Sequence, residues 1–280
     1  METKHDVELR DGRRLIAYDT GAQEEPEALT VVWHHGSPQT GVPLDPLLAA
    51  AGARSIRLVT YARPSYGGSS PNPGRDVASA AADVAQVVDA LGVDRFAVMG
   101  ASGGGPNALA CAALLADRVI GAVTLASLAP LTEDFAWYGG MVSPDGLRAA
   151  AEGRASRERF AETEEFDENS FTPVDWAALS GTWASLGRDA GQAGSAGPDG
   201  LIDDDVAFVS RWGFDVTAIT TPVLLVQGGQ DRVVPPAHAD WLVRNTPSSE
   251  LWLRPRDGHV SVLDACPVAM DWLLAGAGLR

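Results

Sequence analysis

The sequence predicts an α/β fold with a mostly parallel central sheet, flanking helices and an inserted helical cap. Short apolar segments alternate with helix-forming segments over most of the 280 residues, an order typical of a parallel sheet that is covered on both faces. This alternation stops between about residues 131 and 205. We therefore expect a core domain made of residues 1–130 and 206–280, with a helical cap inserted at 131–205.

The N-terminal part should contribute a hairpin, two buried strands and a helix. Residues 7–19 predict the hairpin, because two strand-like segments flank the turn residues Asp11 and Gly12. Its antiparallel strands should lie at one edge of the sheet. Residues 29–33 and 56–61 are apolar enough to be buried strands, and residues 76–91 repeat apolar side chains at three- and four-residue steps, as a helix does.

The remaining core continues the same alternation. The expected elements are, in order, a strand at 96–99, a helix from 107, strands at 119–126 and 222–227, a helix near 237–245, a strand at 251–253 and a last helix near 260–274. The interrupting stretch differs from them, because it clusters acids and aromatics. It also contains a glycine-rich run at 191–200, which we expect to be flexible.

Composition argues against several classes of function. The formal net charge is −16 and the pI is about 4.6, which disfavours nucleic acid as a partner, because phosphate binding needs a basic surface. No apolar stretch is long enough to cross a bilayer, and the first residues lack the apolar segment of a secretion signal. Cys111 and Cys266 have no metal or redox spacing. We expect a cytoplasmic protein with a small-molecule substrate, no membrane partner, no metal and no cofactor; the oligomeric state stays open.

The segment Gly100-Ala-Ser-Gly-Gly104 is the strongest functional signal. It lies between a predicted strand and a predicted helix, where a G-x-S-x-G sequence forms a sharp turn that strains the serine backbone and projects its Oγ from the top of the sheet. Strand and helix approach closely at such a turn, so the flanking residues must be small. Ser102 is therefore the candidate nucleophile.

A serine nucleophile needs a base, and the base needs an acid that orients it. His259 follows the strand at 251–253, and Asp231 follows the strand at 222–227; catalytic side chains gather at such strand ends in open α/β sheets. We assign them as base and acid, with Glu133 or Asp134 as the rival acid. Asp257 is interpreted as a turn residue.

The chemistry also needs donors for a developing oxyanion. The loop after the strand at 29–33 supplies the backbone N–H of Ser37, and the turn after Ser102 supplies that of Gly103, at a helix N-terminus. Gly36 would allow a sharp turn. His35 is expected to steady this loop by hydrogen bonds, and His34 is interpreted as structural.

Together these motifs resemble those of α/β-hydrolases, in the branch of capped esterases, proline iminopeptidases and epoxide-hydrolase-like enzymes. The resemblance covers essentially the whole chain outside the cap, and it rests on four motifs in order along the chain: residues 35–38, 100–104, 228–231 and 258–259. The resemblance implies the α/β-hydrolase fold, with Ser102, Asp231 and His259 in the nucleophile–acid–base order of that family. The serine disfavours family members that use an aspartate nucleophile.

A further segment, residues 63–69, resembles the family's D-R-P-G-x-G-x-S turn. It departs from that pattern, because Ala62 replaces the acid and Ser65 replaces a glycine. We expect this departure to alter a structural turn rather than the reaction.

The cap holds the candidate substrate-binding residues. An apolar pocket over Ser102 could be walled by Trp137, Tyr138, Trp176 and Trp183, together with Phe166 and Phe171. Alternatively, these aromatics could form the cap's own small core. The cap also carries a run of acids that either faces solvent or, as in the similar proline iminopeptidases, binds a substrate ammonium group; it comprises Glu162, Glu164, Glu165, Asp167 and Glu168.

Three functional hypotheses follow. The first is a serine hydrolase that cleaves carboxylic esters of small or medium, largely apolar substrates. The second is an aminopeptidase of the proline iminopeptidase type, which needs an acidic group for a free amine. The third is a non-hydrolytic ligand-binding protein on the same fold, since fold alone does not determine function. C–C bond hydrolysis or perhydrolysis would use the same residues as the first.

Overall fold

The fold is built on one mixed sheet. A computed structural model describes residues 2–21 and 28–278, and in this part of the chain eight strands pair in the order β1-β2-β4-β3-β5-β6-β7-β8. Their bounds are β1 (Thr3–Glu8), β2 (Arg14–Asp19), β3 (Thr30–His34), β4 (Arg57–Tyr61), β5 (Phe96–Ala101), β6 (Val119–Leu125), β7 (Val223–Gly228) and β8 (Ser249–Arg254). The pairs from β4 to β8 are parallel, whereas β1–β2 and β2–β4 are antiparallel. The predicted α/β class and the edge hairpin are confirmed, although β1 starts at Thr3 rather than near residue 7.

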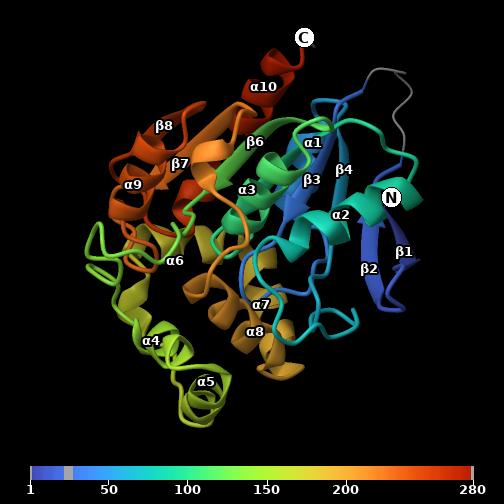
Figure 1. The fold of residues 1–280 in the computed structure, drawn as a ribbon. Helices are drawn as coiled ribbons and strands as arrows, with labels where there is room; N and C mark the ends of the chain where they lie inside the picture. The colour runs from blue at the N-terminus through green and yellow to red at the C-terminus, as the bar shows by residue number, and fades with distance from the viewer. Residues whose placement is uncertain (1, 22–27, 279–280) are drawn as a thin grey trace.

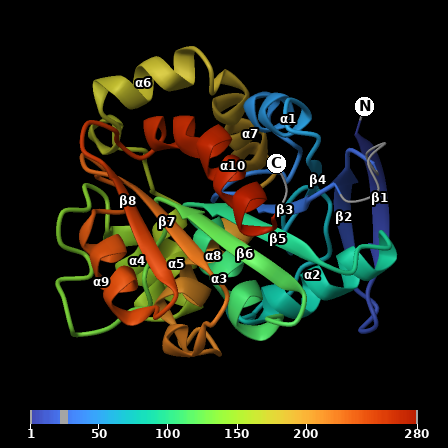
Figure 2. The ribbon, with the colours of Figure 1, turned by 90° about the horizontal axis from the view of Figure 1, so that it is seen from above.

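Helices cover both faces of the sheet because its central strands are apolar on both sides (Figures 1 and 2). Core residues of α1 and α10 pack on one face, and those of α2, α3 and α9 pack on the other. The bounds are α1 (Asp45–Gly52), α2 (Ser79–Ala90), α3 (Gly104–Leu114), α9 (Ala237–Asn245) and α10 (Cys266–Gly276). The pattern did not predict α1, and the last predicted helix is split into a 3-10 turn, η3 (Ser261–Ala265), followed by α10.

The segment between β6 and β7 is helical, as expected, and Figure 1 shows its helices gathered at one end of the sheet. They are α4 (Asp145–Ala151), α5 (Arg154–Ala161), α6 (Pro173–Ser180), α7 (Ala184–Ser195) and α8 (Asp199–Val209), with the 3-10 turn η1 (Glu168–Ser170) before α6. The run at 191–200 is largely helical, because α7 continues to Ser195 and α8 begins at Asp199; its expected flexibility stays a prediction. The division into core and cap stays a prediction, and α8 crosses its proposed boundary at 205.

Buried ion pairs join α8 to the loops after β4. Asp204 pairs with Arg63 (2.6 Å) and Arg75 (2.8 Å), and Asp203 pairs with Arg75 (3.0 Å). Burial of three or more charges is tolerated only when they compensate one another, as they do here. These contacts fix the end of the inserted segment against the core.

The turn at 63–69 is held by side-chain hydrogen bonds, and the expectation that its departure from the family pattern leaves the reaction unaltered stays a prediction. Ser69 Oγ donates to the carbonyl oxygen of Ala62 (2.7 Å) and accepts from the N–H of Ile16 (2.9 Å). Ser65 adopts a φ of +73°, a conformation that favours glycine. Its hydroxyl donates to Asp203 Oδ2 (2.9 Å), so the serine that replaces a glycine contributes a bond to α8.

Candidate active site

Ser102 lies on a strained turn between β5 and α3, as predicted. Its φ is +51°, in the left-handed region that non-glycine residues rarely occupy. The turn is held by a hydrogen bond from the Ser102 N–H to the carbonyl oxygen of Leu125 (2.8 Å). A Cβ on Gly100 would overlap the Gly104 backbone, and one on Gly104 would overlap the carbonyl of His34. The small flanking residues are therefore a steric requirement.

The structure brings Ser102, His259 and Asp231 together from three loops that follow β5, β8 and β7. His259 Nδ1–H donates to Asp231 Oδ2 (2.8 Å), which leaves His259 Nε2 to accept the hydroxyl proton of Ser102 (3.0 Å). Asp231 is fully buried at its side chain, and the His259 side chain is 11% exposed. The arrangement can lower the cost of removing the Ser102 proton, since the base and its orienting carboxylate are already aligned.

The Asp231 carboxylate controls the charge of His259. Burial favours the neutral imidazole, but the charge of Asp231 and its hydrogen bond outweigh burial, and the pKa of His259 is raised above its ordinary value. Asp175 adds a smaller effect in the same direction. A protonated His259 would thus be stabilised by neighbouring negative charge.

The rival acids lie elsewhere. Asp134 accepts a hydrogen bond from the Trp241 indole (3.3 Å), and both Asp134 and Glu133 are exposed. Asp257 pairs with Arg254, as a turn residue would. Asp231 Oδ1 accepts from two backbone N–H groups in the loop that follows it, so one carboxylate both shapes this loop and orients His259.

His35 steadies the loop after β3, as predicted. Its Nδ1–H donates to the carbonyl oxygen of Gly36 (2.6 Å), and its Nε2 accepts from the N–H of Arg63 (3.1 Å). Burial, with a contribution from Arg63, holds the pKa of His35 well below its ordinary value, so the ring is neutral. A Cβ on Gly36 would lie 3.6 Å from Ser102 Cβ, which places this loop directly beside the serine.

Ser37 and Gly103 face each other across the same space. A Cβ on Gly103 would overlap Ser37 Oγ and the Phe208 ring. Within the described residues, no group accepts a hydrogen bond from the backbone N–H of Ser37 or Gly103. The Ser37 hydroxyl is fixed, since it donates to Asp204 (2.5 Å) and accepts from Arg63 (2.8 Å).

Two further histidines are structural. His34 is fully buried between Tyr61 and Cys111, with Nδ1 3.0 Å from the Tyr61 hydroxyl, and burial lowers the pKa of His34 to about 3. His238 accepts from the Ala129 N–H and donates to a backbone carbonyl, and burial lowers the pKa of His238 to about 4. In the part of the chain that the structure describes, neither ring is hydrogen-bonded to Ser102. The interpretation of His34 as structural is in accord with this packing.

Two of the predicted substrate-binding residues are core residues. Trp137 is 3% exposed and donates to the Ala129 carbonyl oxygen (2.9 Å); Trp183 is 1% exposed and donates to Asp264 (2.8 Å). With so little accessible surface they do not wall an open pocket. The sequence could not distinguish a pocket wall from a packed core, because tryptophan occurs in both environments.

The aromatic groups near the site come from the segment before and within α6. The Phe171 ring stacks on the His259 imidazole, with centroids 6.5 Å apart and an interplanar angle of 10°. Phe171 also contacts Phe166 and Trp176, with centroids at 5.2 and 5.4 Å. Phe166 is 61% and Trp176 39% exposed. Trp176 and Phe171 thus lie near His259, and their expected role in substrate binding stays a prediction.

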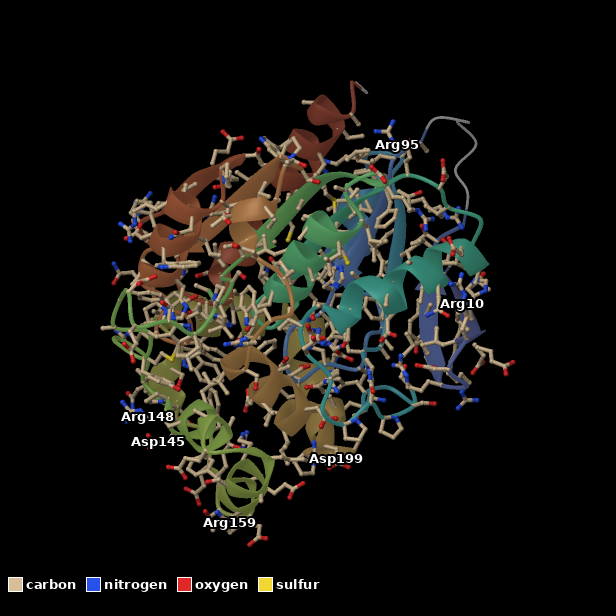
Figure 3. All side chains as sticks on the ribbon, viewed as in Figure 1. Arg10, Arg95, Asp145, Arg148, Arg159 and Asp199 are labelled. Carbon is tan, nitrogen blue, oxygen red and sulfur yellow. The ribbon has the colours of Figure 1, made fainter. Side chains whose placement is uncertain are left out.

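Tyr138, another predicted residue, packs edge-on against Trp137 and lies under the Arg148 guanidinium. Figure 3 shows Arg148 and Asp145 at the outer side of α4. The described contacts thus link Tyr138 to the core and to α4 rather than to Ser102.

The acidic run of the inserted segment is mostly solvated. Glu164 pairs with the buried Arg157 (2.8 Å), and Asp167 accepts from the Asn169 N–H at the start of η1. Glu162, Glu165 and Glu168 are exposed. Glu164 therefore shares the Arg157 guanidinium with Asp205, which lies 2.7 Å from Arg157.

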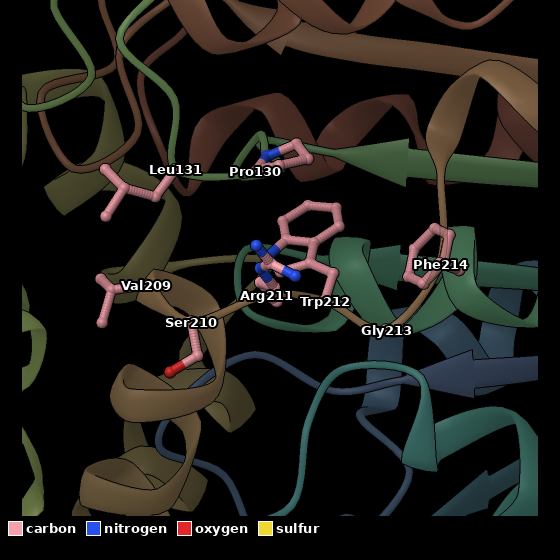
Figure 4. A pocket seen from close by; sticks show the side chains of 8 residues that line it. All are labelled: Pro130, Leu131, Val209, Ser210, Arg211, Trp212, Gly213 and Phe214. Carbon is pink, nitrogen blue, oxygen red and sulfur yellow. The ribbon is translucent and has the colours of Figure 1, made fainter.

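A surface depression of about 570 Å³ lies between the segment after β6 and the segment after α8 (Figure 4). It is lined by Pro130, Leu131 and residues 209–214. None of the three residues of the Ser102 triad lines it. In the described part of the chain, no group of His, Cys, Asp or Glu is arranged to hold a metal ion, and no helix is long and apolar enough to cross a membrane.

The sequence-based interpretation also missed Asp175, on α6. This carboxylate is fully buried and accepts hydrogen bonds from the N–H groups of Val260 and Ser261, directly after His259. Its only sequence signal is Thr172, three residues earlier, which together with Asp175 forms a capping box.

Fold and site together define a class of protein. A family model described as the alpha/beta hydrolase fold matches residues 30–265, and the chain belongs to this family. In its sequence the chain is similar to the non-heme chloroperoxidase of Streptomyces lividans, with 28% identity over 260 residues that cover 83% of this chain and 84% of that protein.

Solved structures agree with the fold. A bromoperoxidase from Bacillus anthracis matches with a TM-score of 0.74 and 21% identity over 98% of both chains. An esterase from Thermogutta terrifontis matches with a TM-score of 0.70 and 20% identity over 99% of both chains. An enol-lactonase from Burkholderia xenovorans LB400 matches with a TM-score of 0.72 and 19% identity, covering 98% of this chain and 100% of the other. At sequence identities this low, the structural similarities show a shared fold and nothing about a shared activity.

Proposed function

We propose that this protein is a serine hydrolase that cleaves carboxylic esters of small or medium, largely apolar substrates. The observation that carries the proposal is the continuous hydrogen-bonded arrangement of Ser102, His259 and Asp231 on a strained strand-to-helix turn. A base within 3.0 Å of the serine oxygen, oriented by a buried carboxylate, is the arrangement that nucleophilic catalysis by serine requires.

The reaction proceeds in two halves. Ser102 Oγ attacks the ester carbonyl carbon while its proton moves to His259 Nε2, and the oxyanion accepts hydrogen bonds from the N–H groups of Ser37 and Gly103. The C–O bond to the alcohol then breaks as His259 returns the proton to the leaving oxygen. Water, deprotonated by His259, attacks the acyl-enzyme, and the acid leaves as Ser102 regains its proton.

The aromatic cluster of Phe166, Phe171 and Trp176 supports an apolar substrate. It lies beside His259 and exposes ring surface to solvent, where an acyl or alcohol group could cover it. The aminopeptidase alternative has less support, because Glu164 is paired with Arg157.

The chloroperoxidase relative favours one second candidate, perhydrolysis on the same residues. Hydrogen peroxide would then replace water as the acceptor of the acyl group and release a peracid. The ester hydrolysis steps that form the acyl-enzyme are unchanged.

A chromogenic panel tests the proposal. It should contain p-nitrophenyl esters of increasing acyl length beside proline and alanine p-nitroanilides, with and without hydrogen peroxide. We expect ester turnover that is lost in Ser102→Ala and kept in Ser195→Ala, an exposed serine on α7. Faster cleavage of anilides than of every ester would favour the aminopeptidase. Peracid formed faster than the carboxylic acid would favour perhydrolysis. If no ester or anilide is turned over but an ester binds, the ligand-binding alternative would be favoured.

A further inference from the structure

Asp175 lies on the inserted helix α6, yet its carboxylate is bonded to the segment that carries His259. Its Oδ1 accepts hydrogen bonds from the backbone N–H of Val260 (2.9 Å) and Ser261 (2.8 Å) and from the Ser261 hydroxyl (2.8 Å). The side chain is fully buried. A buried carboxylate with several donors holds their positions firmly, because each donor that lost it would stay unsatisfied.

The other oxygen of the same carboxylate is fixed to the start of α6. Asp175 Oδ2 accepts from the N–H (2.9 Å) and the hydroxyl (2.8 Å) of Thr172, and Thr172 Oγ accepts from the Asp175 N–H (3.2 Å). This reciprocal pair is the capping box of α6. The carboxylate therefore bridges the first turn of a cap helix and the backbone after His259.

The backbone before His259 is held by the same group. The Gly258 N–H donates to Ser261 Oγ (2.8 Å), and this hydroxyl in turn donates to Asp175. Gly258 also packs so closely that a Cβ there would overlap the Asp175 carboxylate. Both sides of His259 are thus connected to one side chain.

Asp175 is also a charge. Burial opposes ionisation, but hydrogen bonds from Ser261 and Thr172 outweigh it, and the pKa of Asp175 lies below its ordinary value. Two carboxylates therefore act on His259, Asp231 from the loop after β7 and Asp175 from α6, and both raise the pKa of His259. Its other neighbours, Ser102 and Phe171, are neutral.

We propose that Asp175 is a positioning residue for the hydrolysis described above, through which the cap holds the His259 backbone in register with Ser102. Asp231 orients the imidazole ring, and Asp175 fixes the backbone from which the ring projects. The inference rests on the proposed function. Small displacements of a base are costly, since proton transfer needs near-ideal contact with the nucleophile.

The test is Asp175→Asn, assayed with p-nitrophenyl butyrate over a range of pH. We expect kcat to fall by about 10- to 100-fold, with KM little changed, and the midpoint of the acidic limb to move to lower pH because a negative charge near His259 is lost. The matched control is Asp215→Asn, an exposed aspartate that accepts the Thr217 N–H (2.8 Å) at the start of another short helix. It should leave kcat, KM and the midpoint unchanged.

A second variant covers the case in which Asp175→Asn does not fold, as judged by its circular dichroism melt. Ser261→Ala removes the hydroxyl between Gly258 and Asp175 but keeps the charge, so kcat should fall while the pH midpoint stays. Wild-type kcat and midpoint in a folded Asp175→Asn, or wild-type kcat in Ser261→Ala, would overturn the positioning role. Activity that survives Ser102→Ala would instead overturn the proposed function.

Discussion

Asp204→Asn should destabilise the protein strongly, because it leaves the Arg63 guanidinium buried without a carboxylate partner and leaves Arg75 with Asp203 alone. Asp204 lies 2.6 Å from Arg63 and 2.8 Å from Arg75, and these three side chains are 2%, 2% and 6% exposed. Removing one member of a buried ion pair costs about 3–5 kcal/mol of unfolding free energy. For a chain of this size each kcal/mol lowers the melting temperature by roughly 2–4 °C, which gives a fall of about 6–20 °C.

The pH dependence of this loss has a defined sign. Burial alone would favour the protonated acid, but Arg63 and Arg75 outweigh it and hold the pKa of Asp204 far below its ordinary value. A lowered folded-state pKa stabilises the fold above the unfolded value, about 3.9, and the stabilisation disappears as pH falls through the folded value. The difference in unfolding free energy between wild type and Asp204→Asn should therefore be at its full size at neutral pH and should shrink below about pH 4.

The assay is thermal unfolding followed by circular dichroism at pH 7 and at acid pH. The matched control is Asp199→Asn on the same helix, whose side chain is 76% exposed and lies 3.5 Å from Arg154; Figure 3 shows Asp199 at the edge of the molecule. A surface pair of this kind contributes little, so the control should melt like wild type. Equal melting temperatures for the two variants would refute the reasoning. Because Asp204 also accepts the Ser37 hydroxyl, Asp204→Asn should in addition lower kcat at temperatures where it is folded.

The remaining predictions concern the reaction. His259→Ala should be about as damaging to kcat as Ser102→Ala, and the double variant no worse, because the residues act as a unit; additive losses would contradict this. Asp231→Asn should lower kcat less than either, and wild-type kcat would exclude Asp231 as the acid. The rate should rise with pH, because only neutral His259 accepts the proton. The midpoint of this rise should lie above 6.5, the ordinary pKa of histidine, since the pKa of His259 is raised. A profile that stays flat down to about pH 4 would exclude a histidine base. Each added methylene of the acyl group should raise kcat/KM by up to about fourfold until the pocket is full, and Phe171→Ala should reduce this gain; an unchanged preference would exclude Phe171 from binding.

Much of the fold was predictable because its signals are local. The apolar runs that became β3, β5 and β7 are short and bounded by turn residues, and parallel strands leave their following loops at one edge of the sheet. The proximity of Ser102, Asp231 and His259 follows from that edge rule. The glycines at 100 and 104 predicted the tight turn because a side chain does not fit there.

The inserted segment was less predictable because its structure depends on contacts far apart in sequence. The glycines of 191–200 disfavour a helix by propensity, yet α7 extends into this run as far as Ser195, with Asp189 buried against Thr40. Residue type alone also did not separate Trp183, which packs in the core, from Trp176, which is exposed. Asp175 carried no functional signal in the sequence, since its partners lie 85 and 86 residues later.

Covalent labelling of Ser102 tests the central claim most directly. The purified protein should be treated with a serine-directed fluorophosphonate, digested and examined by mass spectrometry. The proposed mechanism predicts one adduct, on the peptide that contains Ser102, with labelling slowed in His259→Ala because the base that removes the serine proton is lost. An adduct on another residue would contradict the assignment of Ser102 as the nucleophile. So would labelling of Ser102→Ala to the same extent as the wild type.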